Sequence, residues 1–136
     1  MTSFILVLIA ATVARFIIGA LWYMPKGLFG KKWLALQGAG PDFQPEKNSG
    51  MWILWGLLVT LLSTFVLTLF VVNYGSNWLQ GVFVTFLLWL GFVLPLFFQR
   101  KLYNLKKDYS WSLFCIDASY ELVNMVVGTL VILALI

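Results

Sequence analysis

Four long runs of apolar residues constrain this chain more than any other feature of its sequence. Each run is close to or above the roughly 20 residues that a helix needs to cross the hydrocarbon core of a bilayer. In lipid such a run folds as a helix, because its backbone N–H and C=O groups find partners only within the segment. The predicted spans cover residues 3–24, 51–72, 79–99 and 111–136.

These spans leave little of the chain for a domain outside the membrane. We therefore predict a single membrane domain over residues 1–136, an all-α membrane protein built as a four transmembrane helix bundle. The composition agrees, since 62% of the residues are hydrophobic and 10% are charged. Soluble domains are about 45–50% apolar and about 25% charged. The first run lacks the basic leader and cleavage site of a signal peptide, so we expect it to be retained as a span.

Basic residues gather in two loops, one between spans one and two and the other between spans three and four. Cytoplasmic loops of membrane proteins carry an excess of lysine and arginine. We therefore expect both loops in the cytoplasm and both termini outside. Only Arg15 lies elsewhere, inside the first span. The loop residues are Lys26, Lys31, Lys32, Lys47, Arg100, Lys101, Lys106 and Lys107.

Aromatic and basic residues mark the expected lipid interface. Trp22 and Tyr23 close the first span, where interfacial aromatic residues are common, and Pro25 should end that helix. Basic residues near this level can also meet anionic lipid headgroups. The predicted interface residues are Trp22, Tyr23, Lys31, Lys32, Trp33, Arg100 and Lys101.

A short helix is predicted after the first span. Phe29, Trp33 and Leu36 have the spacing of one helical face, while Lys31 and Lys32 point elsewhere. This pattern is typical of an amphipathic helix on the cytoplasmic leaflet. An irregular loop with anchoring aromatic residues is the alternative. A polar, turn-forming stretch follows and leads to the second span.

Small and hydroxyl side chains recur every four residues in the second span. They form one stripe, which we expect at a close helix contact, because small residues let membrane helices approach each other. A polar pathway is the alternative interpretation. In the third span, Pro95 cannot donate to the carbonyl of Gly91, which predicts a kink. The stripe consists of Gly56, Thr60, Thr64 and Thr68.

Charged residues within spans one and four are the most informative polar residues. Asp117, Glu121 and Asn124 share one face of the fourth span, and Gly128 extends that face. At 1.5 Å per residue, Arg15 lies about 13 Å from the cytoplasmic end of its span, and the two acids lie about 9 and 15 Å deep. Charges at membrane depth usually face the bundle interior and pair there.

We therefore predict an intramembrane charge cluster of Arg15, Asp117, Glu121 and Asn124, with the guanidinium held by both carboxylates. This requires spans one and four to be neighbours. The cluster has two interpretations. It either fixes helix register as a structural ion cluster, or its excess acid binds a proton, a cation or a polar ligand.

The pattern of several of these residues is similar to that of a known family, the domain of unknown function 1761 family. The resemblance covers most of the chain and implies a small prokaryotic protein with four spans, placed in the plasma (inner) membrane, without implying a catalytic residue. It is carried by Gly19, Trp22-Tyr23, Pro25, Phe29-Gly30-Lys31, Trp33, Trp89-Leu90-Gly91 and the block from Asp117 to Asn124.

Residue content excludes several kinds of chemistry. The chain has no histidine and one cysteine, Cys115, so it holds neither an internal disulfide nor a Cys/His metal site or catalytic pair. We expect no cofactor, no metal and no nucleic acid partner. The sequence favours a non-enzymatic membrane protein that self-associates or serves as an accessory subunit of a larger complex, with membrane lipids as partners. A small proton- or cation-linked transporter or channel is the alternative, and an enzyme acting on lipids has the least support.

Overall fold

The structure is a computed structural model that describes residues 3–24, 27–39 and 49–136. Within these residues, four helices are long and apolar enough to cross a membrane. The predicted all-α bundle is therefore confirmed, and the largest boundary difference is at the end of the third span, predicted at residue 99 and found at Leu102. The four are α1 (Phe4–Tyr23), α3 (Ser49–Tyr74), the continuous helix Trp78–Leu102 and α6 (Trp111–Leu135).

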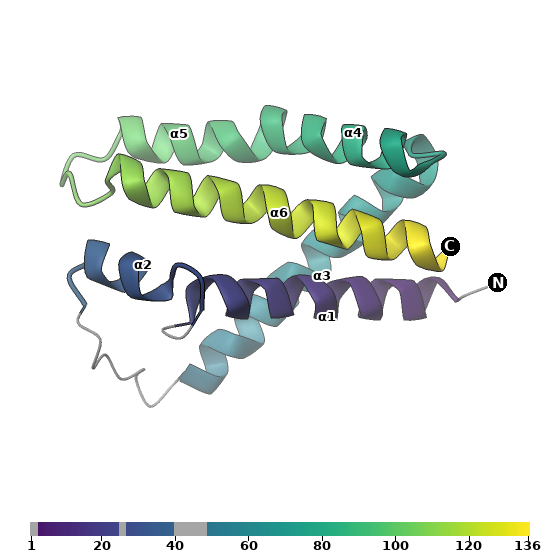
Figure 1. Cartoon of the computed structure of the whole chain (residues 1–136), viewed down its shortest axis with the longest axis horizontal. Coiled ribbons are helices and arrows are strands. Elements are labelled where there is room, and N and C mark those ends of the chain that lie inside the picture. Colours follow the sequence, from purple (N-terminus) through teal and green to yellow (C-terminus); the bar gives the residue numbers. More distant parts are fainter. Residues whose placement is uncertain (1–2, 25–26, 40–48) are drawn as a thin grey trace.

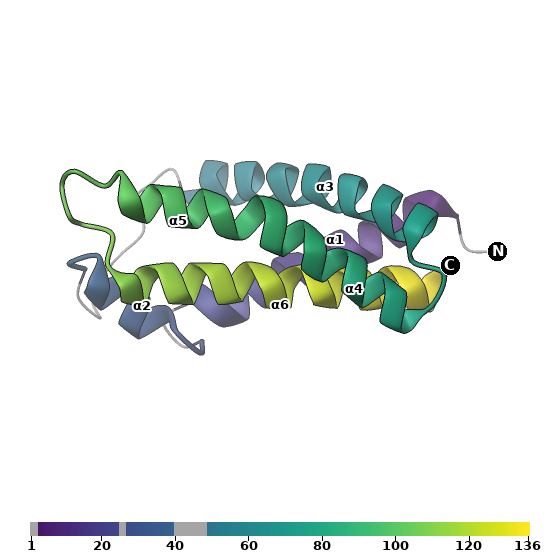
Figure 2. The ribbon, with the colours of Figure 1, turned by 90° about the horizontal axis from the view of Figure 1, so that it is seen from above.

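The helix α6 is at the centre of the bundle. It packs extensively on α1, to which it runs antiparallel, and on the helix Trp78–Leu102, and it also contacts α3. The predicted adjacency of spans one and four is thus confirmed. Figure 1 shows α3 crossing behind the other helices at a steep angle, and Figures 1 and 2 place both termini at the same end of the bundle. We call the opposite end, where α1 ends and α6 begins, the loop end.

The chain reverses tightly after α1. The amides of Leu28 and Phe29 donate to backbone carbonyls in the last turns of α1, at 2.8 and 3.0 Å. A Cβ atom at Gly30 would lie 1.8 Å from the carbonyl oxygen of Met24, so only glycine fits at this backbone contact. The predicted helix-ending residue Pro25 lies outside the described residues.

A short helix, α2 (Gly30–Leu36), follows this turn and packs against α1 and α6. The predicted helix is therefore confirmed, although its buried side differs from the expected apolar face. Leu34 is buried and Trp33 half-buried, whereas Phe29 is exposed. The predicted turn-forming stretch after α2 lies largely outside the described residues.

The third spanning helix has three parts, α4 (Trp78–Leu88), a π-helical turn η1 (Trp89–Val93) and α5 (Leu94–Leu102). The helix widens into this turn just before Pro95, where a kink is predicted, and the amide of Leu94 bonds there to the carbonyl oxygen of Trp89, five residues back. Proline lacks the N–H that would continue the regular helix. The indole N–H of Trp89 then donates to the Ala118 carbonyl oxygen at 2.9 Å, which ties η1 to α6.

The character of the interior changes along the bundle. The buried apolar cluster lies toward the termini together with buried threonines such as Thr85 and Thr129, whereas the buried charged and amide side chains lie nearer the loop end. The charged residues of α1 and α6 are therefore in one region. The apolar cluster comprises Val7, Ala11, Leu67, Val71, Met125 and Ile132.

Only part of the stripe on α3 is buried. Thr64 and Thr68 are fully buried, but Gly56 is exposed, and a Cβ atom there would only touch Phe16 at 3.8 Å. The close contact expected along the whole stripe is therefore wrong at its Gly56 end. Because α3 crosses the bundle obliquely, only part of its length reaches the interior. Each of the stripe's threonine hydroxyls donates to the backbone carbonyl four residues earlier.

Candidate functional site

Two of the predicted polar residues of α6, Asp117 and Asn124, bond to side chains of α1, as their shared helix face predicts. Asp117 and Asn124 are buried and Glu121 is half-buried. Arg15, on α1, is also buried, with 3% of its surface exposed. The structure thus brings the four predicted residues into one region of the interior, but their contacts differ from the predicted ones.

Arg15 is held by neutral partners. Its Nε donates to Oδ1 of Asn124 at 2.5 Å, and its Nη1 donates to the hydroxyls of Ser63 and Thr64 on α3 at 3.1 and 3.0 Å. The Asn124 amide in turn donates to the Arg15 carbonyl oxygen at 3.2 Å and to the Tyr120 hydroxyl at 2.6 Å. This network joins α1, α3 and α6 around a single buried cation.

The predicted pairing of Arg15 with two carboxylates is therefore wrong. Side chains tilt toward the N-terminus of their own helix. Since α1 and α6 are antiparallel, Arg15 tilts toward the termini end of the bundle, whereas Asp117 and Glu121 tilt toward the loop end. Matching depths along the two helices were not enough, because the side chains tilt in opposite directions along the bundle.

Asp117 accepts hydrogen bonds from two tyrosines instead. The Tyr23 hydroxyl donates to Oδ1 at 2.6 Å, and the Tyr109 hydroxyl donates to Oδ2 at 2.7 Å. Burial and the bond to Asp117 raise the pKa of Tyr109 above its ordinary value, so its phenol stays protonated and remains a donor. Sequence reasoning assigned Tyr23 to the lipid interface and did not single out Tyr109. Tyr109 directly precedes Ser110, the capping residue of α6, and this proximity to Asp117 along the chain was the available signal.

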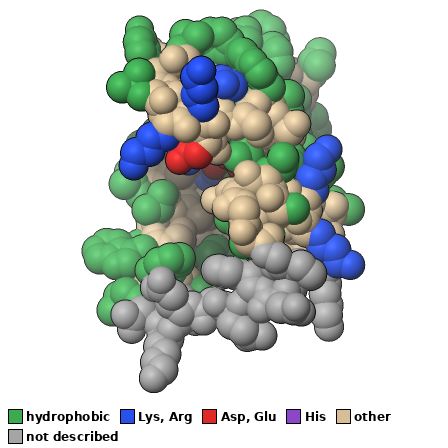
Figure 3. Space-filling model, turned by 90° about the vertical axis from the view of Figure 1, so that its left-hand side faces the viewer, with side chains coloured by type: hydrophobic (Ala, Val, Ile, Leu, Met, Phe, Trp, Pro, Cys, Tyr) green, Lys and Arg blue, Asp and Glu red, His purple; other side chains and the backbone are tan. Residues whose placement is uncertain are grey.

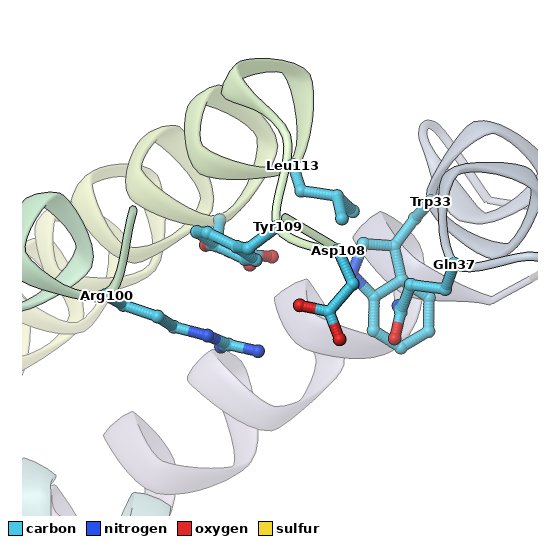
Figure 4. A pocket seen from close by; sticks show the side chains of 7 residues that line it. Trp33, Gln37, Arg100, Asp108, Tyr109 and Leu113 are labelled. Atoms are coloured by element: carbon cyan, nitrogen blue, oxygen red, sulfur yellow. The ribbon is translucent and has the colours of Figure 1, made fainter. Parts of the chain in front are cut away.

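A cavity of about 190 Å³ opens above Asp117 at the loop end. It lies between α2, the end of α5 and the start of α6, and Figure 4 shows its side chains converging from these three elements. Figure 3 views this end of the molecule, with acidic side chains inside a hollow and basic side chains around its rim. The cavity is lined by Trp33, Gln37, Arg100, Asp108, Tyr109, Leu113 and Asp117.

Arg100 is the basic residue in this lining. Its guanidinium carbon lies 4.2 Å from the centre of the Tyr109 ring, a cation–π contact. In Figure 4 the carboxylate of Asp108 points from the loop toward Arg100. Two acids and one base therefore line the cavity, which carries a formal charge of −1 when all three are ionised. Trp33 and Tyr109 add aromatic surface.

A second hollow, of about 380 Å³, reaches Glu121 from the outer surface of the bundle. It lies between Val93 at the end of η1, residues of α5 and Glu121 on α6. Its wall includes Leu96, which is 66% exposed, so the hollow opens sideways. Arg100 lines both hollows. The two acids of α6 are thus reached from different directions.

The predicted interface residues divide into two sets. Trp22 and Tyr23 pack their rings near Tyr120 rather than only facing lipid, with centroid distances of 6.1 and 4.8 Å. Trp33 and Arg100 line the cavity. Lys31 and Lys32 are exposed on α2, and Lys101 lies 5.1 Å over the ring of Trp111.

The part of the chain that the structure describes contains no group of three or more His, Cys, Asp or Glu side chains placed to hold a metal ion. The cavity combines carboxylates, one guanidinium, an amide and aromatic rings. This set of groups suits hydrogen bonding and cation binding.

The family model "Protein of unknown function (DUF1761)" matches residues 6–133, nearly the whole chain, so the chain belongs to this family. The resemblance seen in the sequence is thereby confirmed. No curated protein and no solved structure matches the chain.

Proposed function

We propose that this DUF1761 family member is a non-enzymatic integral membrane protein that binds a proton or a small cation at the acidic face of α6 and passes it along that face. One observation carries the proposal. Asp117 is at the floor of a cavity and receives its hydrogen bonds from neutral phenols, while the buried Arg15 is satisfied by other neutral groups. The sequence favoured a subunit role, and two acids that form no ion pair within the described residues support its alternative.

An uncompensated charge inside the bundle carries a free-energy cost. A carboxylate within a membrane span is expensive unless a cation, a proton or water compensates it. Had Arg15 bridged both acids, its charge would have compensated one of the two carboxylates within the protein. With the guanidinium held by Asn124, Ser63 and Thr64, the acids of α6 are available to an external cation.

The direction of access follows from the position of the cavity. Both basic loops lie at the loop end. The positive-inside rule therefore supports a cavity that opens on the cytoplasmic side of a prokaryotic inner membrane. Glu121 follows Asp117 by one helical turn, about 6 Å farther along α6. This spacing supports two successive binding positions.

Reconstituted vesicles provide the test. We expect vesicles with the wild-type chain to dissipate an imposed pH or cation gradient faster than empty vesicles, and Asp117→Asn to slow this by tenfold or more. Ser119→Ala is the matched control, because Ser119 is exposed on α6 and its hydroxyl bonds to its own helix. Melting curves in detergent check that each variant folds. A wild-type rate equal to that of empty vesicles, or an undiminished rate for a folded Asp117→Asn protein, contradicts the proposal.

A self-associating or accessory role is the second candidate, and the position of Glu121 favours it. One chain leaves this acid in a hollow that opens at the side of the bundle. A second copy packed over the hollow would shield Glu121 from lipid. Native mass spectrometry from mild detergent tests this idea. We expect a dimer or higher oligomer, weakened by Leu96→Trp within the hollow and unaffected by Leu79→Trp on the distant part of the same helix. A strictly monomeric chain contradicts it.

A further inference from the structure

We propose that the loop-end cavity binds a small organic cation of the guanidinium or alkylammonium class, in the position that the Arg100 side chain now fills. This inference rests on the proposed function and names the class of cation. It is carried by the geometry of Arg100, Tyr109 and Asp117 around one cavity.

The side chain of Arg100 shows how a flat cation is held there. Its guanidinium lies over the Tyr109 ring at 4.2 Å, and the hydroxyl of that same ring donates to Asp117. The face of the Tyr109 ring is therefore turned toward the Arg100 guanidinium, while its hydroxyl is held by the Asp117 carboxylate. Ring faces attract cations through their negative quadrupole. A ligand guanidinium finds the same surface when the arginine moves away.

Arg100 is able to move away because of its position. It is exposed and lies in the last turn of α5, at the rim of the cavity. Its aliphatic stem can therefore extend into the headgroup region, as long basic side chains do near membrane surfaces. The residues that remain, Asp108, Asp117 and the rings of Tyr109 and Trp33, then form a cavity with a formal charge of −2.

The charge and size of the cavity limit the range of ligands that it can bind. The carboxylates favour a cation over an anion, and Gln37 adds an amide that can accept or donate a hydrogen bond. A volume of about 190 Å³ admits a compound of a few non-hydrogen atoms. Methylguanidinium is a suitable probe, because it is small, planar and permanently charged.

Saturation-transfer difference NMR on the methyl signal of methylguanidinium measures its binding to the full chain in nanodiscs of zwitterionic lipid. We expect binding at millimolar concentration or tighter. The substitution Arg100→Gln should strengthen methylguanidinium binding about three- to tenfold. It removes a positive charge that competes with the ligand, in a partly buried site where charges interact more strongly than in water. Asp117→Asn should weaken binding by a similar factor or abolish it.

Two further variants keep the test decisive. Lys106→Gln removes the same charge from an exposed loop position outside the cavity lining, and it should leave the affinity within about twofold, since exposed charges are screened. Asp108→Asn, at the exposed rim, should weaken binding even if Asp117→Asn does not fold.

The sign of the Arg100 effect decides between ligand classes. If Arg100→Gln weakens methylguanidinium binding, or if acetate or phosphate binds the wild type and loses affinity in Arg100→Gln, the cavity is an anion site and the inference is wrong. No detectable methylguanidinium binding to wild type and Arg100→Gln also overturns it. Proton flux that still depends on Asp117 would then leave the proposed function standing, with a proton or an inorganic cation as the species carried.

Discussion

Asn124 on α6 holds Arg15 of α1 at two points. Its Oδ1 accepts a hydrogen bond from the arginine Nε at 2.5 Å, and its Nδ2 donates to the arginine carbonyl oxygen at 3.2 Å. One neutral amide thus accepts a hydrogen bond from the buried guanidinium and also donates one to the backbone of the same arginine. This reciprocal contact links α1 and α6 at a fixed register.

Removing this amide should destabilise the protein strongly. In Asn124→Ala, the buried Nε of Arg15 loses its partner, and an unsatisfied charged donor in the interior costs about 2–4 kcal/mol. Reversible unfolding in mixed detergent micelles measures the loss. Ser119→Ala, exposed on the same helix, should change stability by less than about 0.5 kcal/mol. Equal stability of Asn124→Ala and wild type would mean that the clamp contributes nothing.

Substitution of Gly128 should destabilise the protein more than substitution of Gly56. A Cβ atom at Gly128 would lie 2.7 Å from Cδ and 3.1 Å from Cγ of Arg15, whose guanidinium is fixed by hydrogen bonds. Gly128→Ala should therefore cost about 1–3 kcal/mol through overpacking. Gly56→Ala meets only Phe16 at 3.8 Å and should be neutral or slightly stabilising, because alanine favours helix more than glycine does. The same unfolding assay compares the two, and the reverse order would contradict the packing described here.

The hydrogen bond from Tyr109 to Asp117 should stabilise the fold over a defined pH range. The phenol of Tyr109 has a raised pKa in the folded protein, and in the unfolded chain it ionises near pH 10. Its contribution is therefore complete below about pH 10 and is lost as the pH rises through the raised folded value. We expect Tyr109→Phe to lower stability by about 1–3 kcal/mol, equally at pH 7 and pH 9. A difference that disappears between these two pH values would be inconsistent with this bond.

Labelling of single cysteines tests the orientation. In a Cys115→Ala background, we expect Leu105→Cys at the loop end to resist an impermeant thiol reagent in intact cells, and Ser76→Cys at the opposite end to react. Both positions are exposed in the structure, so access to reagent depends on the side of the membrane. The basic loops predict this pattern. Permeabilised cells serve as the control, since both cysteines should then react. The opposite pattern in intact cells would place the loop end outside.

The helices and the polar face of α6 were readable from the sequence. An apolar run long enough to span a bilayer has only one stable backbone conformation there, so span length alone located the four helices. Helical periodicity likewise placed Asp117, Glu121 and Asn124 on one face, and the shared interior region with Arg15 followed from the cost of lone charges in lipid.

Only the tertiary structure decided which groups pair. Pairing depends on side-chain direction and on the crossing of helices, and neither is encoded in depth along a single helix. Opposite tilts on antiparallel helices led Arg15 to Asn124 and left Asp117 to Tyr23 and Tyr109. The oblique path of α3 likewise buried Thr64 and left Gly56 exposed, although the two belong to one periodic stripe. Spacing along a helix sets the face of a residue, but the neighbouring helices determine what that face meets.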